Sequence, residues 1–249
     1  MHRLLVGTEL LNEESPTLPK DAARHLKVLR PKDGEEIELF DGKGKWRVYS
    51  CSSARESASP LCAQSNIRTI EQSNNSLTLF ACVTKGSRWD WTIEKATELG
   101  VTRIVPVVSE RTIVRIPKAE RTAKRERWMR IAEDAARQSD AKWLPEICEA
   151  VDFRDALPLV KDTTCFIGAL TTPPSPPLAR AIGNFNTETQ RHRGFGVFVG
   201  PEGDFTPEEL EALMEIAVPT SFGPTILRAE TAAIYAVSVL VSTLHGATL

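Results

Sequence analysis

Short apolar runs separated by turn-forming residues characterise the first seventy positions of the chain. Between two of these runs, residues 41–44 read Asp-Gly-Lys-Gly, which favours a hairpin turn because glycine adopts positive φ without a side-chain clash. A short helix is predicted over 19–29. Several short strands with little helix are typical of a small β-barrel. Three runs have strand character: 3–7, 36–40 and 45–51.

After a polar linker at 71–76, apolar runs alternate with segments of helical periodicity. The runs at 165–170 and 196–199 are continuously apolar, as in strands buried within a parallel sheet. Strands that alternate with helices predict a parallel α/β sheet. The chain is therefore expected to hold two domains, over 1–72 and 76–249. The remaining predicted strands are 77–83 and 103–108, and the predicted helices are 90–99, 119–142, 206–217 and 229–245.

Capping residues mark the ends of two predicted helices. Asp90 is a candidate N-cap, and Gly100 marks the end of the same helix. In the second helix, Thr206 is the expected N-cap, with proline following it and Glu209 placed to close a capping box.

Three strand ends carry glycine-rich or polar segments, at 170–172, 200–204 and 222–231. Each segment taken alone is an ordinary turn or the first turn of a helix. Ligands of open α/β sheets bind beyond the carboxyl ends of the strands, where glycine lets the backbone approach closely. The joint placement of the three segments therefore predicts one shared pocket.

Composition bounds the class of protein. The chain has 249 residues, of which 41% are hydrophobic and 26% charged, with a net charge of -2. These values are typical of a globular protein and exclude a disordered or fibrous one. The apolar stretch 229–244 is interrupted by polar residues, which disfavours a membrane span. We expect a cytoplasmic protein.

The cysteine and glycine patterns disfavour several other kinds of site. The five cysteines form no Cys-x-x-Cys pair and are expected to be buried free thiols, and with only four histidines no metal site is predicted. The sequence contains no Gly-x-Gly-x-x-Gly after a strand and no Walker loop, so a dinucleotide-binding or P-loop domain is not supported.

Two loop motifs resemble those of the 16S rRNA uridine-N3 methyltransferases, the RsmE family of the SPOUT superfamily. Residues 198–206 read Phe-Val-Gly-Pro-Glu-Gly-Asp-Phe-Thr, and 222–232 read Phe-Gly-Pro-Thr-Ile-Leu-Arg-Ala-Glu-Thr-Ala. Segments at 85–91, 94–101 and 109–111 match the start of the family's catalytic domain. The segments 25–30, 33–34 and 40–42 are similar to its RNA-binding domain. The resemblance covers nearly the whole chain.

The resemblance implies a PUA-like β-barrel over 1–72 that binds RNA, followed by a SPOUT methyltransferase domain over 76–249. It implies a parallel sheet with a C-terminal trefoil knot, a homodimer, and S-adenosyl-L-methionine (SAM) held by the knot loops. The apolar residues around nearly every side of 229–245 agree with burial by a partner subunit. The residues expected to bind the cofactor are Leu170, Thr171, Gly200, Pro201, Glu202, Gly203, Phe222, Gly223, Ile226, Leu227, Thr231 and Ala232.

The chain departs from the family pattern at two places. Asp204 stands where the family usually has a second glycine. Residues 137–141 read Arg-Gln-Ser-Asp-Ala, where the family tends to have Glu-Gln-x-Gly-Arg.

The expected reaction assigns catalytic roles to three residues. Uracil N3 carries a proton that must leave, and negative charge then spreads onto the carbonyl oxygens. Arg228 is the candidate to stabilise this anion because its guanidinium is permanently charged. Glu202 or Glu230 is the candidate proton acceptor or sulfonium partner, although Glu230 equally suits the first turn of a helix.

The expected partner is 16S rRNA or the assembled small ribosomal subunit. N3 lies on the Watson–Crick edge, so the target uridine must be unpaired or flipped out. His25 suits either base stacking or packing on the barrel. The basic run within 118–130 is interleaved with glutamates, which is typical of a solvated helix face. The candidate RNA-binding residues are Arg3, Arg24, His25, Arg30, Lys43, Lys85, Arg88 and Arg111.

Two alternatives stay open within this interpretation. The chain could be a SPOUT methyltransferase for another RNA site or a ribose hydroxyl, or a noncatalytic RNA-binding ribosome assembly factor. An unrelated α/β enzyme explains the barrel segments and both loop motifs less well.

Overall fold

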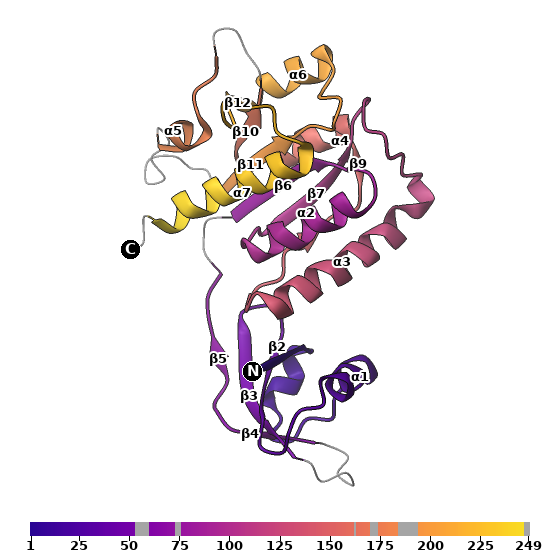
Figure 1. Cartoon of the computed structure of the whole chain (residues 1–249), viewed down its shortest axis with the longest axis vertical. Coiled ribbons are helices and arrows are strands. Elements are labelled where there is room, and N and C mark those ends of the chain that lie inside the picture. The colour runs from indigo at the N-terminus through magenta and orange to yellow at the C-terminus, as the bar shows by residue number, and fades with distance from the viewer. Residues whose placement is uncertain (53–59, 73–75, 162, 170–173, 184–193, 247–249) are drawn as a thin grey trace. The chain divides into compact units, whose positions relative to one another are not determined.

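The computed structural model describes residues 1–52, 60–72, 76–161, 163–169, 174–183 and 194–246, and the side chains of 244–246 are outside this description. The chain divides into two compact units, each described by itself below (Figure 1). The first comprises Met1–Gln72 together with Glu133–Leu144, and the second comprises Ser73–Ala132 together with Pro145–Leu249. The first unit thus includes a segment from the middle of the chain.

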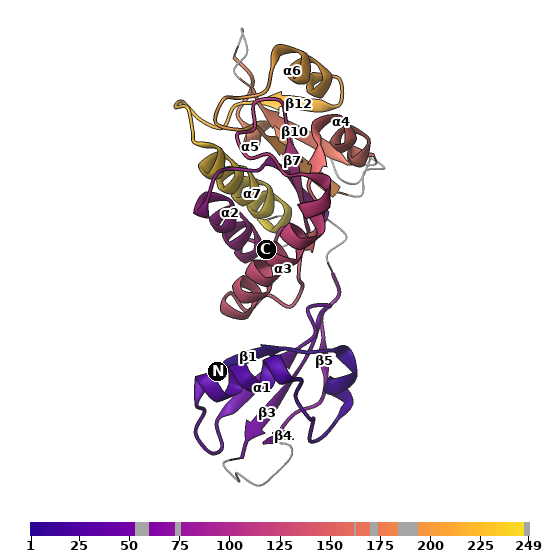
Figure 2. The ribbon, with the colours of Figure 1, turned by 90° about the vertical axis from the view of Figure 1, so that its right-hand side faces the viewer.

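A five-stranded sheet forms the centre of the first unit, in the order β1-β2-β3-β4, with β5 also paired to β3. β1 runs parallel to β2, and β2 is antiparallel to β3. Helix α1 (Lys20–Leu29) packs beside β1 (Figure 2). The strands are β1 (His2–Leu5), β2 (Glu36–Phe40), β3 (Lys45–Cys51), β4 (Leu61–Ala63) and β5 (Arg68–Thr69), and a 3-10 helix, η1, spans Thr8–Asn12.

The core of this unit follows from the alternation of side chains along its strands. Ile37, Leu39 and Tyr49 are completely buried, and residues of η1 and α1 pack against the same cluster. The predicted hairpin between β2 and β3 is confirmed, because Gly42 and Gly44 adopt φ values of 66° and 88°. Both predicted strands also end where the sequence placed them.

A second sheet, of seven strands, forms the centre of the second unit. Its order is β12-β10-β11-β6-β7-β8, with β9 also paired to β7. Every pairing is parallel, which confirms the predicted parallel α/β sheet. The strands are β6 (Ser76–Cys82), β7 (Arg103–Val108), β8 (Glu146–Ile147), β9 (Val151–Asp152), β10 (Thr164–Gly168), β11 (Gly194–Val199) and β12 (Ala217–Thr220).

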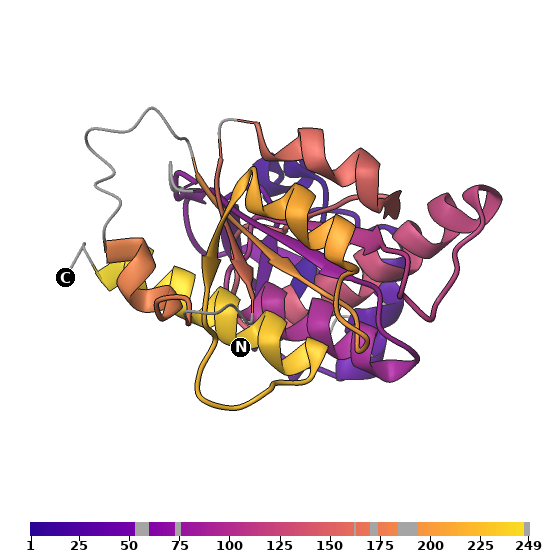
Figure 3. The same ribbon diagram turned by 90° about the horizontal axis from the view of Figure 1, so that it is seen from above.

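Helices cover both faces of this sheet because successive side chains of its strands point to opposite sides (Figure 3). In β6, Leu79 and Ala81 face one core with α2, α3, α5 and α7, whereas Phe80 and Cys82 face the other with α4 and α6. The helices are α2 (Ser87–Glu98), α3 (Arg121–Gln138), α4 (Phe153–Ala156), α5 (Leu178–Gly183), α6 (Pro207–Met214) and α7 (Ala229–Gly246), with 3-10 helices η2 (Lys118–Glu120) and η3 (Leu157–Val160). In the described part of the chain, every helix is too short or too polar to span a lipid bilayer.

Helix boundaries show where the sequence prediction was right and where it was wrong. Thr206 caps α6 in a complete capping box with Glu209, as predicted. Asp90 is not an N-cap, because α2 begins three residues earlier after Gly86 and places Asp90 in its first turn. Helix α3 ends at Gln138 rather than at 142, since Asp140 takes a left-handed conformation with φ of 59°.

The cysteines only partly follow the expectation of buried thiols. Cys51, Cys82 and Cys165 are buried, but Cys62 is exposed on β4 and Cys148 is partly exposed. Burial raises the pKa of Cys82 to about 11 and that of Cys165 to about 12. These two thiols are therefore held protonated near neutral pH.

Candidate functional site

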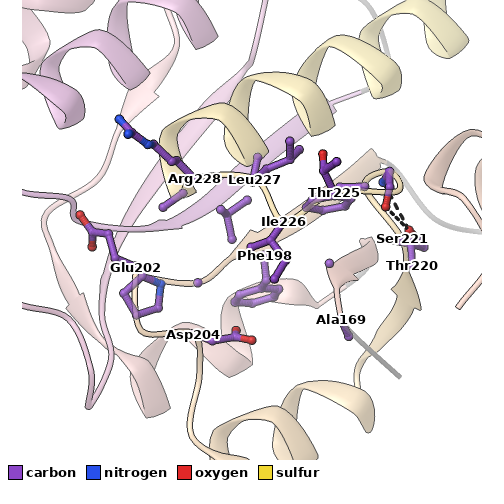
Figure 4. A pocket seen from close by; sticks show the side chains of 18 residues that line it. Ala169, Phe198, Glu202, Asp204, Thr220, Ser221, Thr225, Ile226, Leu227 and Arg228 are labelled. Atoms are coloured by element: carbon purple, nitrogen blue, oxygen red, sulfur yellow. Dashed lines mark hydrogen bonds between the residues drawn. The ribbon is translucent and has the colours of Figure 1, made fainter. Parts of the chain in front are cut away.

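A cavity of about 350 Å³ opens at the carboxyl ends of β10, β11 and β12, and we call it the strand-end cavity (Figure 4). This is the edge of a parallel sheet at which ligands bind, and the volume lies in the range of small-molecule sites. Its lining residues are Gly168, Ala169, Phe198, Val199, Gly200, Pro201, Glu202, Asp204, Thr220, Ser221, Phe222, Gly223, Thr225, Ile226, Leu227, Arg228, Ala229 and Ala232.

Most of the predicted cofactor-binding residues meet at this cavity. Those that line it are Gly200, Pro201, Glu202, Phe222, Gly223, Ile226, Leu227 and Ala232. Gly203 and Thr231 belong to the same loops but are not among the lining residues. Leu170 and Thr171 lie outside the described residues. Sequence reasoning missed Thr220, since β12 is only four residues long and contains a proline.

Hydrogen bonds hold the loop from β11 to α6 in one conformation. The backbone N–H of Asp204 donates to the carbonyl of Pro201 at 2.9 Å, and one carboxylate oxygen of Asp204 accepts the N–H of Phe205 at 2.8 Å. From the end of β7, Arg111 donates Nη1 to the carbonyls of Gly203 at 3.0 Å and Phe205 at 3.3 Å. The predicted RNA-binding residue Arg111 thus holds this loop in place.

A second set of hydrogen bonds joins the loop after β7 to the segment between β11 and α6. Glu209 is buried, and one of its oxygens accepts the backbone N–H of Glu110 at 2.9 Å while the other accepts that of Thr206 at 3.1 Å. The capping box of α6 therefore also anchors the loop after β7. Because a one-letter sequence shows only the local Thr-x-x-Glu pattern, the contact across 99 residues could not be predicted from it.

The loop from β12 to α7 forms the other wall of the cavity. Gly223 has φ of 132°, a conformation that side chains rarely adopt. The Phe222 ring lies directly over Gly168, where an added Cβ would come within 2.6 Å of Cε2. Ile226 is 86% exposed at the edge of the cavity. The wall is therefore largely apolar, and glycine at 168 leaves room for the ring.

Two acidic side chains share one arginine beside the cavity. Arg88 Nη1 lies 3.3 Å from Glu202 Oε1, and Arg88 Nε lies 3.9 Å from Glu230 Oε1. The Glu230 side chain is 12% exposed, and its Oε2 is buried without a hydrogen-bond partner in the described structure. Arg88, predicted as an RNA ligand, thus joins the two predicted catalytic carboxylates, although Glu230 does not itself line the cavity.

Arg228 lies at the start of α7 and lines the cavity. In the described part of the chain its guanidinium has no ion-pair partner within 4.0 Å, so its donors are open to a ligand. Figure 4 shows the side chain extending away from Phe198 and Ser221. The arrangement offers a free cation at the edge of an apolar cavity, with carboxylates nearby.

The other predicted RNA-binding residues fall into two groups. Arg3 is buried, and its guanidinium donates to Glu38 at 2.8 Å and to the carbonyls of Ala136 at 2.5 Å and Ala141 at 2.9 Å. These bonds join β1 to the Glu133–Leu144 segment of the first unit. Arg3 therefore has a structural role, and its buried side chain is not available to bind RNA. The remaining side chains are exposed: Arg24, His25, Arg30 and Lys43 in the first unit, and Lys85 and Arg88 in the second.

No group of three or more His, Cys, Asp or Glu side chains suited to a metal ion occurs among the described residues.

Comparisons with known proteins identify relatives over almost the full chain. A model of an RNA methyltransferase domain matches residues 71–241, and one of an RNA methyltransferase PUA domain matches 18–50. The ribosomal RNA small subunit methyltransferase E of Synechocystis is 32% identical over 93% of this chain and 74% of its own length. That of Bacillus subtilis is 28% identical over 92% of this chain and 91% of its own.

Solved structures that are similar to this chain include methyltransferases bound to SAM. The crystal structure of a ribosomal RNA small subunit methyltransferase E from Neisseria gonorrhoeae, bound to S-adenosyl methionine, is 29% identical with a TM-score of 0.80, and the match covers 98% of each chain. A second structure, from Legionella pneumophila and in complex with bound SAM, is 26% identical with a TM-score of 0.75.

Proposed function

Because the chain belongs to the ribosomal RNA small subunit methyltransferase E family of RNA methyltransferases, we propose that it transfers the methyl group of SAM to N3 of a uridine in 16S rRNA. The observation that carries the proposal is the strand-end cavity, because the two family motifs of the sequence form opposite walls of this one cavity.

The residues of the strand-end cavity fit SAM. The Phe198, Leu227 and Ile226 side chains offer apolar surface of the kind an adenine ring packs on, and carboxylates beside them suit a ligand with positive charge. Gly200 keeps the loop compact, since a Cβ there would lie 3.2 Å from the Asp204 carboxylate and the Phe205 ring. When bound, SAM supplies a methyl group already activated by its sulfonium.

The chain's own residues must then align a uracil ring and accept its N3 proton. Arg228 stabilises the negative charge that develops on the uracil carbonyl oxygens, because its guanidinium is at the cavity and unpaired within the described structure. Glu202 is the proposed proton acceptor, since it lines the cavity. Glu230 and Arg88 complete the charge arrangement around Glu202.

RNA binding is proposed for the exposed basic side chains in both units. Phosphate contacts by such residues give affinity that falls with salt concentration. The first unit carries three of these side chains on and beside α1, at Arg24, His25 and Arg30, within the PUA domain match. We therefore propose that this unit is a PUA-like barrel that binds 16S rRNA or the assembled small subunit. Because ribosomal RNA is the proposed substrate, we also propose that the enzyme works in the cytoplasm.

The trefoil knot and the homodimer are further parts of the proposal. The proposal of a knot is supported by the resemblance to the family and by the cavity, which is built from the loops that the resemblance assigns to the knot. The dimer is supported by α7, where the apolar side chains of Ile234, Val239 and Val241 are only partly covered in the single chain.

The experiment is methylation in vitro of small subunits from a strain that lacks the enzyme, with wild type, Arg228→Ala and Arg154→Ala compared. Loss of one charge-stabilising group typically lowers kcat by about 10²–10³. We expect that decrease for Arg228→Ala, with the SAM affinity little changed. Arg154 lies on α4, exposed and outside the strand-end cavity, and its variant should match wild type. Equal activity in all three proteins would exclude Arg228 from the mechanism.

A further inference from the structure

Asp204 is the carboxylate of the strand-end cavity whose charge is least offset. Among the described residues that line the cavity, the charged ones are Glu202, Asp204 and Arg228. Glu202 is paired with Arg88, whereas Asp204 has no ion pair within 4.0 Å in the described structure. Arg111 is nearby, but it directs its donors to backbone carbonyls on either side of Asp204. A ligand in the cavity therefore meets the negative charge of Asp204.

The backbone at Asp204 is fixed before any ligand arrives. Its φ of 59° is left-handed, a conformation that aspartate adopts more readily than most residues because its short side chain can hydrogen-bond to the nearby backbone. The bond from the Phe205 N–H to Oδ1 and the two bonds from Arg111 to the flanking carbonyls hold this conformation. Oδ1 is thereby occupied, whereas Oδ2 accepts no hydrogen bond from the described residues. In Figure 4 the carboxylate lies beside the Phe198 ring.

We propose that Asp204 makes the cavity selective for the charged methyl donor over the product that remains after transfer. This inference rests on the proposed function. In the reaction the N3 electron pair forms the new bond to the methyl carbon, the S–CH₃ bonding pair returns to sulfur, and the N3 proton goes to a base. SAM, with its sulfonium, becomes S-adenosylhomocysteine (SAH), a neutral thioether. SAM thus carries one more positive charge than SAH, whatever the protein contacts elsewhere.

The electrostatic attraction of a carboxylate therefore acts on SAM more than on SAH. Asp204 is exposed, so solvent and salt screen this attraction, and the expected effect is modest. We expect removal of the charge to lower the ratio of SAM affinity to SAH affinity about 3- to 10-fold. In the wild type this preference favours SAM when SAM and SAH compete for the cavity.

The test compares Asp204→Asn with wild type by calorimetric titration of SAM and of SAH at low and moderate salt. Asparagine tolerates the left-handed conformation, and its carbonyl oxygen can still accept the Phe205 N–H, so the loop is retained while the charge is lost. Asp155→Asn on α4 is the matched control, because this aspartate lies outside the strand-end cavity. Thermal unfolding checks that all three proteins are folded.

The expected result is weaker SAM binding by Asp204→Asn, little change in SAH binding, and a smaller difference at the higher salt. An unchanged ratio, whether both affinities stay constant or fall together, would overturn the inference and leave the proposed function standing. A wild-type protein that binds neither compound would overturn both.

Discussion

Gly168→Ala is the substitution that most sharply tests the walls of the strand-end cavity. Gly168 ends β10, and the Phe222 ring lies over it. An added Cβ would lie 2.6 Å from Cε2, 2.8 Å from Cδ2 and 3.0 Å from Cζ of that ring. Carbon atoms in ordinary contact are about 3.5–4.0 Å apart, so the ring must move by about 1 Å. Tyr235 of α7 also packs against this ring, with ring centroids 5.9 Å apart, and the ring lines the cavity, so we expect the ring to move toward the cavity.

The size of the effect follows from this displacement. Overpacking of this kind costs about 1–3 kcal/mol. If the ring relaxes into the cavity, a bound ligand must push it back, and the same free energy appears as lost affinity. At about 1.4 kcal/mol per factor of ten, we expect the SAM dissociation constant to rise about 5- to 150-fold.

Calorimetric titration of SAM into wild type, Gly168→Ala and Gly183→Ala measures this effect. Gly183 ends α5, and an added Cβ there meets no heavy atom of the described residues within 4 Å, so its alanine variant should bind SAM as wild type does. Adding Phe222→Leu to Gly168→Ala should restore affinity by removing the collision. If Gly168→Ala binds SAM as tightly as wild type but has a lower Tm, the Phe222 ring moves in another direction and is not a wall of the SAM site.

Three further predictions concern stability and thiol chemistry. Arg3→Met should lower the free energy of unfolding, measured in urea, by about 2–4 kcal/mol, because the Glu38 carboxylate loses one buried partner and keeps only Lys142. Lys27→Met, at an exposed position of α1, is the control and should cost less than about 0.5 kcal/mol. An equally small cost for Arg3→Met would refute the structural role of Arg3. Burial raises the pKa of Cys82 to about 11 and that of Cys165 to about 12. In the native protein at pH 8, the exposed Cys62 should therefore be alkylated well before Cys82 and Cys165. Equal alkylation rates for the three thiols would contradict the burial of Cys82 and Cys165. Because the folded protein holds these two protons more tightly than the unfolded chain, their contribution to stability is full below about pH 9 and is lost as the pH rises toward 11–12, which unfolding at a series of pH values measures.

Local patterns predicted much of the fold. The bounds of β2, β3 and β7 match the sequence prediction residue for residue, because alternating or continuously apolar runs there are bounded by turn formers. The capping box of α6 was equally readable, since its partners are three residues apart. Short elements such as β8, β9 and β12 carry too few residues for a pattern and were missed.

Contacts between distant residues could not be predicted from such patterns. Nothing local distinguishes buried Arg3 from the exposed basic residues, and its burial depends on carbonyls more than 130 positions away. The pairing of Arg88 with Glu202 likewise joins residues 114 positions apart. The sequence identified the loops of the cavity, whereas the role of each charge within it required the structure.

The position of the transferred methyl group tests the central claim most directly. Small subunits from a strain lacking the enzyme are incubated with purified wild-type protein and isotope-labelled SAM, and the digested 16S rRNA is mapped by mass spectrometry. One labelled uridine methylated at N3 is the predicted result. Label on a ribose hydroxyl or on another base, or no transfer despite bound SAM, would contradict the account.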